Sequence, residues 1–443
     1  MVRAGPTADA IMTPKTLQIP IVVTILVSGP IHSETTPTTP PPPSIAFAEA
    51  CTVVSAPLGL PNPARFGIAV AMSEDHLFVG CDGRRDGPPI EGQVLVFESD
   101  ETGNWRWTDS IISPAAEAGD EFGTTLSLES GRLLVGAPGA DAQRGAAWCV
   151  DIGMPHQGLH RIRRVPIPKA VPGDRFGETI AIRGDLVAVG APRSDVDGFL
   201  DRGRVVTARL TGRGLEPLGE PVPERSRTGL RFGGSILIGK ELIIGAPGAE
   251  ARGHPPRLEI DRAGVVVRCA LSTPHHHIES IQRSGADRLD RFGSWLAGVE
   301  DLILVGSPRA ALNGVRSGVI SMVSPGPEIE IGAADHPESG LGGPLVCNGR
   351  CFAAGMPARL TPDLRRISGV RLGLVRPGML VPRLDLVFNE RERTAASLAF
   401  SASGGILVVG APDPSIDDGP ETPGRVHLVH LDPVLRRVLG PLP

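Results

Sequence analysis

Aromatic residues are scarce in this sequence: they make up 4% of its 443 residues, and tyrosine is absent. Ligand pockets are mostly lined by apolar and aromatic side chains with a few polar groups. The scarcity therefore counts against a glycan-binding protein whose pockets rest on aromatic rings. Lysine is scarce too, with three lysines among 44 basic residues and arginine as the other 41. The formal net charge is −5, and no basic stripe indicates nucleic acid as a partner.

Sequence motifs that carry chemistry are also missing. The sequence has no Gly-x-Ser-x-Gly elbow, no Cys-x-x-Cys pair, no His-Glu-x-x-His and no glycine-rich phosphate loop ahead of a helix. Acidic and basic residues are abundant, but they fall in turns at repeat-related positions, which is typical of solvated side chains. We therefore predict no catalytic residue, no metal site and no cofactor, and we expect the protein not to be an enzyme.

The N-terminal region has a composition of its own. Its apolar segment 19–27 follows Lys15 and is shorter than the roughly 20 residues needed to span a bilayer. Such a segment is typical of the apolar core of a signal peptide. We expect residues 1–33 to be a signal peptide and residues 34–50, rich in Pro and Thr, to be an extended linker. The sequence thus predicts a secreted, periplasmic or cell-surface protein without a membrane span.

One block of about 17 residues recurs along the rest of the chain. It is clearest at residues 176–192, where Phe-Gly is followed by an alternating strand, a polar turn, an apolar strand and Gly-Ala-Pro. Clean copies begin at Phe66, Phe122, Phe176, Phe232 and Phe292, and degraded copies begin at Leu341 and Thr394. The copies are spaced by 50–60 residues, a period that fits a four-stranded propeller blade.

Two further strands complete each repeat unit. The third strands follow the Gly-Ala-Pro loop, at Gln93–Phe97, 204–207, 318–322 and 425–429. Weaker fourth strands precede the next Phe-Gly, as at Trp105–Ile111 and Val265–Cys269. Helical periodicity is nearly absent. The sequence therefore predicts an all-β protein, a seven-bladed β-propeller of four-stranded antiparallel blades over residues 51–443.

The Phe-Gly and Gly-Ala-Pro pairs, with lead-ins such as Gly173-Asp174-Arg175, resemble the FG-GAP repeat family. The resemblance covers about residues 51–443 and implies the propeller found at the head of integrin α subunits and in many secreted bacterial proteins. Many family members hold an Asp-rich calcium loop between Phe-Gly and Gly-Ala-Pro, because calcium needs six to eight oxygen ligands. Here that stretch is only 12 or 13 residues long in the clean copies and is already used by two strands. The calcium sites are therefore not carried over.

The repeat also predicts how the blades meet. Each Phe ring is expected to pack between neighbouring blades. Copies six and seven lack Phe, which predicts looser seams there, with Leu341 as a partial substitute. The last blade needs one more strand to close the ring, and either Cys51–Ser55 or residues 434–439 fit that place.

Three short motifs invite a functional interpretation. His275–His277 follows Pro274, and since successive strand residues point to opposite faces, we expect a surface loop between blades. Asp195, Asp197 and Asp201 superficially resemble a calcium loop, but they follow Gly-Ala-Pro, so we expect a solvated turn. Residues 183–185 spell Arg-Gly-Asp, the tripeptide that integrins recognise, but they occupy a hairpin-turn position. We expect a structural turn there.

The six cysteines are too few for a disulfide framework in a chain of this size. Cys347 and Cys351 flank Asn348-Gly349, which favours a hairpin turn, so a disulfide between them stays open. The others are expected to pack as small apolar residues: Cys51, Cys81, Cys149 and Cys269.

These observations favour a secreted or cell-envelope binding module that is monomeric and non-enzymatic. It would bind an unknown protein or cell-surface ligand through propeller loops, as in cell adhesion, although fold alone is a weak guide to function. A glycan-binding, lectin-like propeller and an enzyme with a site in the central channel are the alternatives. The loops 363–366 and 413–418, in the irregular copies, are the predicted positions for function.

Overall fold

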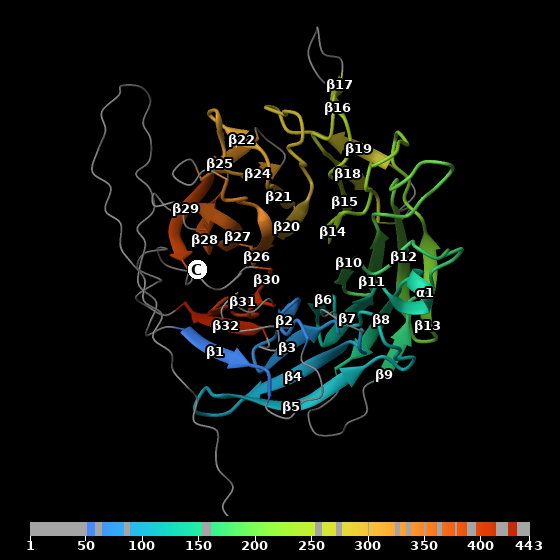
Figure 1. The fold of residues 1–443 in the computed structure, drawn as a ribbon, viewed down its shortest axis with the longest axis vertical. Helices are drawn as coiled ribbons and strands as arrows, with labels where there is room; N and C mark the ends of the chain where they lie inside the picture. Colours follow the sequence, from blue (N-terminus) through green and yellow to red (C-terminus); the bar gives the residue numbers. More distant parts are fainter. Residues whose placement is uncertain are drawn as a thin grey trace, which may run out of the picture.

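Seven four-stranded antiparallel sheets surround a central axis, as Figure 1 shows. The computed structural model describes residues 51–57, 64–83, 89–152, 161–252, 259–271, 277–299, 301–323, 328–333, 338–349, 351–360, 366–376, 379–387, 396–412 and 424–431. The first strands of neighbouring sheets contact one another around the ring, so they line the axis and the later strands lie progressively outward. The predicted all-β fold, a seven-bladed β-propeller, is confirmed.

The blades follow one another along the chain. Blades 1 and 2 consist of β2 (Val70–Met72), β3 (His76–Cys81), β4 (Gln93–Ser99), β5 (Trp105–Ile112), β6 (Thr125–Glu129), β7 (Arg132–Ala137), β8 (Ala146–Asp151) and β9 (Arg161–Arg164). Blades 3 and 4 consist of β10 (Thr179–Arg183), β11 (Leu186–Ala191), β12 (Arg204–Thr211), β13 (Gly214–Gly219), β14 (Ser235–Ile238), β15 (Leu242–Ala246), β18 (Val265–Cys269) and β19 (His277–Ile281). Blades 5 to 7 consist of β20 (Trp295–Val299), β21 (Leu302–Ser307), β24 (Val319–Val323), β25 (Ile329–Gly332), β26 (Gly343–Cys347), β27 (Cys351–Leu360), β28 (Arg366–Arg376), β29 (Met379–Val387), β30 (Ser397–Phe400), β31 (Ile406–Ala411), β32 (Arg425–His430) and β1 (Cys51–Ser55).

The ring closes by pairing the first described strand with the last. β1 pairs antiparallel with β32 in a register that runs from Cys51 opposite Val429 to Ser55 opposite Arg425. Figure 1 shows the two strands side by side, β1 in blue and β32 in red. Of the two closing strands that the sequence allowed, Cys51–Ser55 is therefore the one used. The alternative, residues 434–439, lies outside the described residues.

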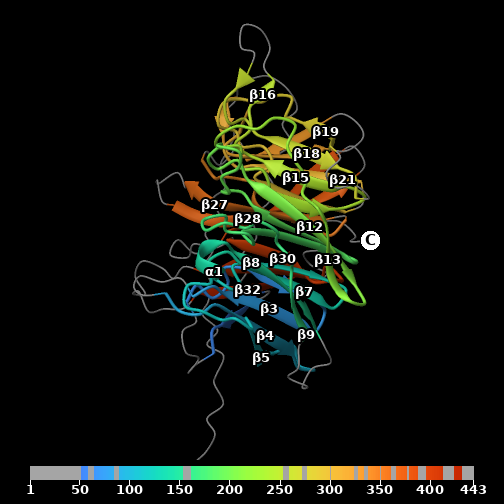
Figure 2. The ribbon, with the colours of Figure 1, turned by 90° about the vertical axis from the view of Figure 1, so that its right-hand side faces the viewer.

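Blade 4 departs from the predicted strand count. The sequence pattern predicted Val265–Cys269 as a fourth strand, and this is wrong: β18 pairs with both β15 and β19 and is the third strand. A short hairpin, β16 (Ala251–Arg252) and β17 (Glu259–Ile260), is inserted between β15 and β18. The third strand of blade 4 therefore begins later in the sequence, where the repeat pattern predicted the fourth. Figures 1 and 2 place β16 at the rim of the ring, beyond β18 and β19. A second such hairpin in blade 5 joins β22 (Ala311–Leu312) to β23 (Val315–Arg316).

The Phe of each clean repeat fills the seam between two blades, as predicted. Phe122, for example, packs with Val94 of blade 1 and Leu133 of blade 2 and is fully buried. The same burial holds for the other four: Phe66, Phe176, Phe232 and Phe292. Leu341 takes this place between blades 5 and 6 and is equally buried. The looser seam predicted from the missing Phe is therefore not found at this residue.

The two glycines of the motif set the spacing between blades. The N–H of Gly177 donates to the carbonyl of Gly190 in the same blade at 3.1 Å, with φ of +98° at Gly177, a conformation that glycine adopts most easily. The carbonyl of Gly177 in turn lies against blade 2, where a Cβ on Gly136 would come within 2.3 Å of it. The Thr125 hydroxyl donates to the same carbonyl at 2.7 Å. Backbone therefore meets backbone at the seam, which leaves no room for a side chain.

We expect Gly245→Ala to lower the free energy of unfolding by about 1–3 kcal/mol, because overpacking forces a backbone shift. The new Cβ would lie 2.1 Å from the carbonyl oxygen of Gly293 in the next blade. Gly212→Ala is the matched control, since a Cβ there meets no atom within 4 Å. Urea unfolding of both variants measures the difference, and equal midpoints would contradict this account of the motif.

Helix is almost absent from the described residues. The one helical segment, α1 (Ala140–Gln143), has four residues, with left-handed backbone angles at Asp141 and Ala142. No helix in the described part of the chain has the length and apolar character that crossing a membrane requires.

Candidate binding site

The seam between blades 4 and 5 has the smallest apolar core among the described residues. Its cluster contains five buried side chains, those of Ile243, Val266, Phe292, Ile303 and Val305. The other clusters each contain eleven or twelve. Since less apolar surface is buried here, polar contacts contribute more of what holds these two blades together.

A cleft of about 560 Å³ opens along this seam, within the range typical of ligand pockets. The turns at one end of the first strands border it, through Lys240 and Glu241 in blade 4 and Asp301 in blade 5. Aliphatic side chains form its apolar wall: Leu237, Ile243, Ile281, Ile303 and Val323. We call this cavity the blade 4–5 cleft.

Charged groups are concentrated around the cleft. Arg268 donates to Glu241 at 2.6 Å and to Glu279 at 2.7 Å. The hydrogen bond that Arg268 donates to Glu241 is the main cause that raises the pKa of Arg268. Lys240 reaches across the seam to Asp301 at 2.5 Å. Counting Glu328 as well, four carboxylates face two cations, so the cleft carries a local excess of negative charge.

Glu328 has an unsatisfied oxygen at this cleft. Its Oε2 accepts a hydrogen bond from the N–H of Ser284 at 2.8 Å. Its Oε1 is buried and has no hydrogen-bond partner among the described residues. A buried polar atom without a partner costs about 1–3 kcal/mol, and a ligand that donates a hydrogen bond would remove that cost.

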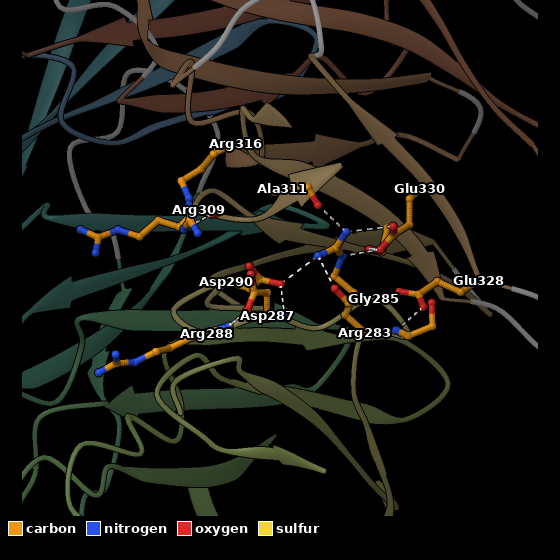
Figure 3. Close-up of polar contacts among 12 residues, drawn as sticks. Arg283, Gly285, Asp287, Arg288, Asp290, Arg309, Ala311, Arg316, Glu328 and Glu330 are labelled. Carbon is orange, nitrogen blue, oxygen red and sulfur yellow. Dashed lines mark hydrogen bonds and ion pairs between the residues drawn. The ribbon is translucent and has the colours of Figure 1, made fainter. Parts of the chain in front are cut away.

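A buried ion network surrounds Arg283, the residue before Ser284, as Figure 3 shows. Arg283, only 3% exposed, donates to Asp290 at 2.8 Å and to the Ala311 carbonyl at 2.8 Å, and it forms an ion pair with Glu330 of β25. Asp290 is fully buried. Burial raises the pKa of Asp290, while the N–H of Asp287 and the Arg283 guanidinium act to lower it. The network ties blade 4 to blade 5 beside the cleft.

The cysteines are free thiols in the structure. The predicted turn at Asn348-Gly349 is present, but Cys347 pairs with Phe352 across it. Because successive strand residues point to opposite faces, Cys347 faces the core between blades 5 and 6, and Cys351 faces the core between blades 6 and 7. The open alternative of a disulfide between them is therefore wrong. Burial raises the pKa of the Cys351 thiol to about 11.

The remaining cysteines match the predicted packing role. Cys81, Cys149 and Cys269 are buried, and Cys51 is half-buried.

The three acidic side chains of the Asp195 loop already have partners within the protein. The Asp195 carboxylate accepts the N–H of Asp201 at 2.8 Å. Asp197 pairs with Arg202 at 3.5 Å and Asp201 pairs with Arg231 at 3.8 Å. The predicted turn is confirmed. Within the described ranges, no group of three or more His, Cys, Asp or Glu side chains is placed to hold a metal ion.

The Arg-Gly-Asp tripeptide is a structural turn, as predicted. Gly184 joins β10 to β11 with φ of +59°, and Asp185 pairs with Arg209 of β12 at 3.4 Å. The Arg183 guanidinium donates to the carbonyl of Ile238 in the next blade at 3.3 Å. All three residues therefore serve the hairpin and its neighbours.

Other predicted positions lie largely outside the described residues. These are residues 1–50, His275 and His276, residues 363–365 and the loop 413–418. His277 begins β19 within blade 4. The blade 4–5 cleft is not evident in the sequence, because its walls come from segments about 60 residues apart.

The comparison with protein families matches residues 169–205 to the FG-GAP repeat. This range contains the copy that begins at Phe176 together with its Gly-Ala-Pro. The repeat at residues 169–205 is an FG-GAP repeat. No curated protein matches the chain. A solved structure described as the crystal structure of RRP9 WD40 repeats aligns with this propeller at a TM-score of 0.53 and 11% identity, over 88% of this chain and 99% of that chain. At such low identity the similarity shows the fold alone.

Proposed function

We propose that this FG-GAP propeller is a secreted or cell-envelope binding module without enzymatic activity. It acts as a monomer and binds a protein or cell-surface ligand at the blade 4–5 cleft. Propellers present loops on a rigid ring, which is a common basis for protein interaction, but a fold alone does not establish a function. The observation that carries it is the cleft itself, where an apolar wall meets an unsatisfied carboxylate oxygen.

The chemistry of the cleft favours a basic side chain in an otherwise apolar segment. A lysine or arginine of the ligand would donate to Oε1 of Glu328, and aliphatic neighbours would cover Ile281 and Val323. Hydrogen bonds to charged groups contribute about 1.5–3 kcal/mol each. An extended peptide of this composition fits a seam better than a sugar does, since no residue lining the cleft is aromatic.

The innermost strands give little support to the alternative of an enzyme in the central channel. Among the described innermost strands, charged side chains occur at two positions only, Glu129 in β6 and Arg183 in β10. Both lie at the ends of their strands. General acid–base chemistry needs titratable groups within hydrogen-bond reach of one another or of the substrate, and these strands do not supply such a group.

A peptide titration tests the proposed function. We expect an eight-residue peptide with one Arg flanked by Leu and Val to bind the full chain, and Glu328→Gln to weaken that binding about tenfold, equivalent to about 1.4 kcal/mol. The glutamine keeps a carbonyl oxygen for the Ser284 N–H, so the fold is preserved. Glu117→Gln, at an exposed position of another cavity, is the control. Fluorescence polarisation measures the affinities, and binding that ignores Glu328→Gln would contradict the proposal.

A further inference from the structure

The residue before each Phe-Gly has the same backbone conformation in every clean copy. Its φ lies between +55° and +59° in all five cases: Arg65, Glu121, Arg175, Arg231 and Arg291. Since the backbone repeats, the side chains at this position can be compared from blade to blade. Two further positions, the residue after Phe-Gly and the residue after Gly-Ala-Pro, are compared by their place in the motif.

Between blades 2 and 3 these positions form a balanced ion network. Arg175 contacts Glu121 of the preceding copy at 2.6 Å and Glu178, the residue after Phe-Gly, at 2.8 Å. Arg193, the residue after Gly-Ala-Pro, contacts Glu178 at 3.4 Å. Two guanidiniums therefore face two carboxylates. Burial lowers the pKa of Arg175, but hydrogen bonds with Glu178 and Glu121 outweigh burial and raise it.

Between blades 4 and 5 the same four positions carry three positive charges and no negative one. Arg231 stands where Glu121 stands, Arg291 where Arg175 stands, and Ser294 where Glu178 stands. Arg309 follows Gly-Ser-Pro at the position of Arg193. We call Arg231, Arg291 and Arg309 the arginine cluster.

Neighbouring groups add to this positive charge. The N–H of Arg291 donates to the carbonyl of Arg262 at 3.2 Å, and the Arg316 guanidinium donates to the carbonyl of Arg309 at 2.9 Å, as Figure 3 shows. Two carboxylates lie nearby: that of Asp201 is 3.8 Å from Arg231, and that of Asp261 is 3.9 Å from Arg262. None of the described carboxylates pairs with Arg291 or Arg309.

The excess positive charge affects the pKa of the half-buried Arg291. Burial lowers the pKa of Arg291, and the guanidiniums of Arg309, Arg231 and Arg262 lower it further. This is the reverse of the shift at Arg175. Like charges gathered in a partly desolvated place cost stability, and an anionic ligand would remove that cost.

We propose that the arginine cluster binds two carboxylates of an acidic segment in a partner protein. One carboxylate takes the place that Glu178 occupies between blades 2 and 3, where the chain here has the smaller Ser294, and the second pairs with Arg231. That network shows that carboxylates of protein side chains fit this backbone frame at 2.6–3.4 Å from the guanidiniums. Arginine pairs well with carboxylates because its planar fork matches both oxygens.

The arginine cluster is separate from the blade 4–5 cleft. Arg291 precedes β20, whereas Asp301 of the cleft follows it. A five-residue strand spans roughly 17 Å. None of the three arginines lines the cleft, so Glu328→Gln should leave binding at the arginine cluster unchanged.

Restoring the missing carboxylate within the chain tests the proposal. The probe is a labelled eight-residue peptide of Asp and Glu, with a matched peptide of Asn and Gln, titrated into the full chain by fluorescence polarisation. We expect the acidic peptide alone to bind. Ser294→Glu, which places a carboxylate at the position of Glu178, should raise the unfolding temperature and weaken peptide binding at least tenfold. Arg291→Gln should weaken binding similarly without lowering the unfolding temperature, and Arg193→Gln is the control with unchanged affinity.

Three results would overturn the proposal. The first is equal binding of the acidic and neutral peptides. The second is unchanged affinity in both Ser294→Glu and Arg291→Gln. The third is displacement of the acidic peptide by a heparin-type sulfated tetrasaccharide or by inorganic phosphate at concentrations below that of the peptide, which would assign the cluster to a glycan or a phosphate ligand instead of a protein.

Discussion

A chain that begins at residue 57, and therefore lacks β1, should lose about 5 kcal/mol of unfolding free energy relative to one that begins at residue 51. β1 supplies the outer strand of blade 7 through a register of five residue pairs with β32, and each hydrogen bond contributes about 1 kcal/mol. Its loss also exposes β32 as an unpaired edge. Urea unfolding measures the stability, and size-exclusion chromatography should show association of the shortened chain.

The contrast between these two chains tests closure of the ring directly. Both lack residues 1–50, so that any effect of those residues cancels. A variant with Val54→Asp adds a milder test, because Val54 is buried in the core between blades 7 and 1. Equal stability of the two chains would show that β1 does not close the ring.

Arg283→Met should lower the free energy of unfolding by about 3–5 kcal/mol, the cost of leaving a buried charge without its partner. Asp290 is fully buried and would retain one hydrogen bond, from the N–H of Asp287. Glu330 would lose its partner across the seam as well. Arg288→Met is the control, since this side chain is 70% exposed and such surface changes stay within about 0.5 kcal/mol.

The destabilisation of Arg283→Met should also depend on pH. Burial already raises the pKa of Asp290, and Arg283 acts against that rise. Without Arg283 the folded-state pKa rises further above its unfolded value. A raised carboxyl pKa costs stability above that pKa, and the cost disappears as the pH falls toward the unfolded value. Urea unfolding at several pH values should show a shrinking difference from wild type on acidification, and a constant difference would contradict the assignment.

Much of the fold could be predicted from the sequence because the repeat is local. Phe, the paired glycines and Gly-Ala-Pro recur at short spacing, and each has a role within one blade or at one seam. The prediction of the strands in blade 4 failed because of the inserted hairpin β16–β17; the described residues of blades 1 to 3 form no two-stranded hairpin at that place. Whether Cys347 and Cys351 form a disulfide could not be predicted, because this depends on which face of the sheet each side chain occupies.

The blade 4–5 cleft could not be predicted, since Lys240 and Asp301 meet only when two blades pack. The arginine cluster was different: Arg231, Arg291, Ser294 and Arg309 are visible in an alignment of the repeats against one another. The sequence alone does not show that these positions come together across a seam between blades. The change of charge lies in clean copies four and five, whereas the loops predicted to carry function lie in irregular copies six and seven.

A crossed titration tests the central claim that ligands bind between blades 4 and 5, at the blade 4–5 cleft and at the arginine cluster. Wild type, Glu328→Gln and Ser294→Glu are each titrated with the Arg-containing peptide and with the acidic peptide. The account predicts that Glu328→Gln weakens only the first about tenfold and that Ser294→Glu weakens only the second at least tenfold. Failure of both peptides to bind wild type, or equal affinities in all three proteins, would contradict it.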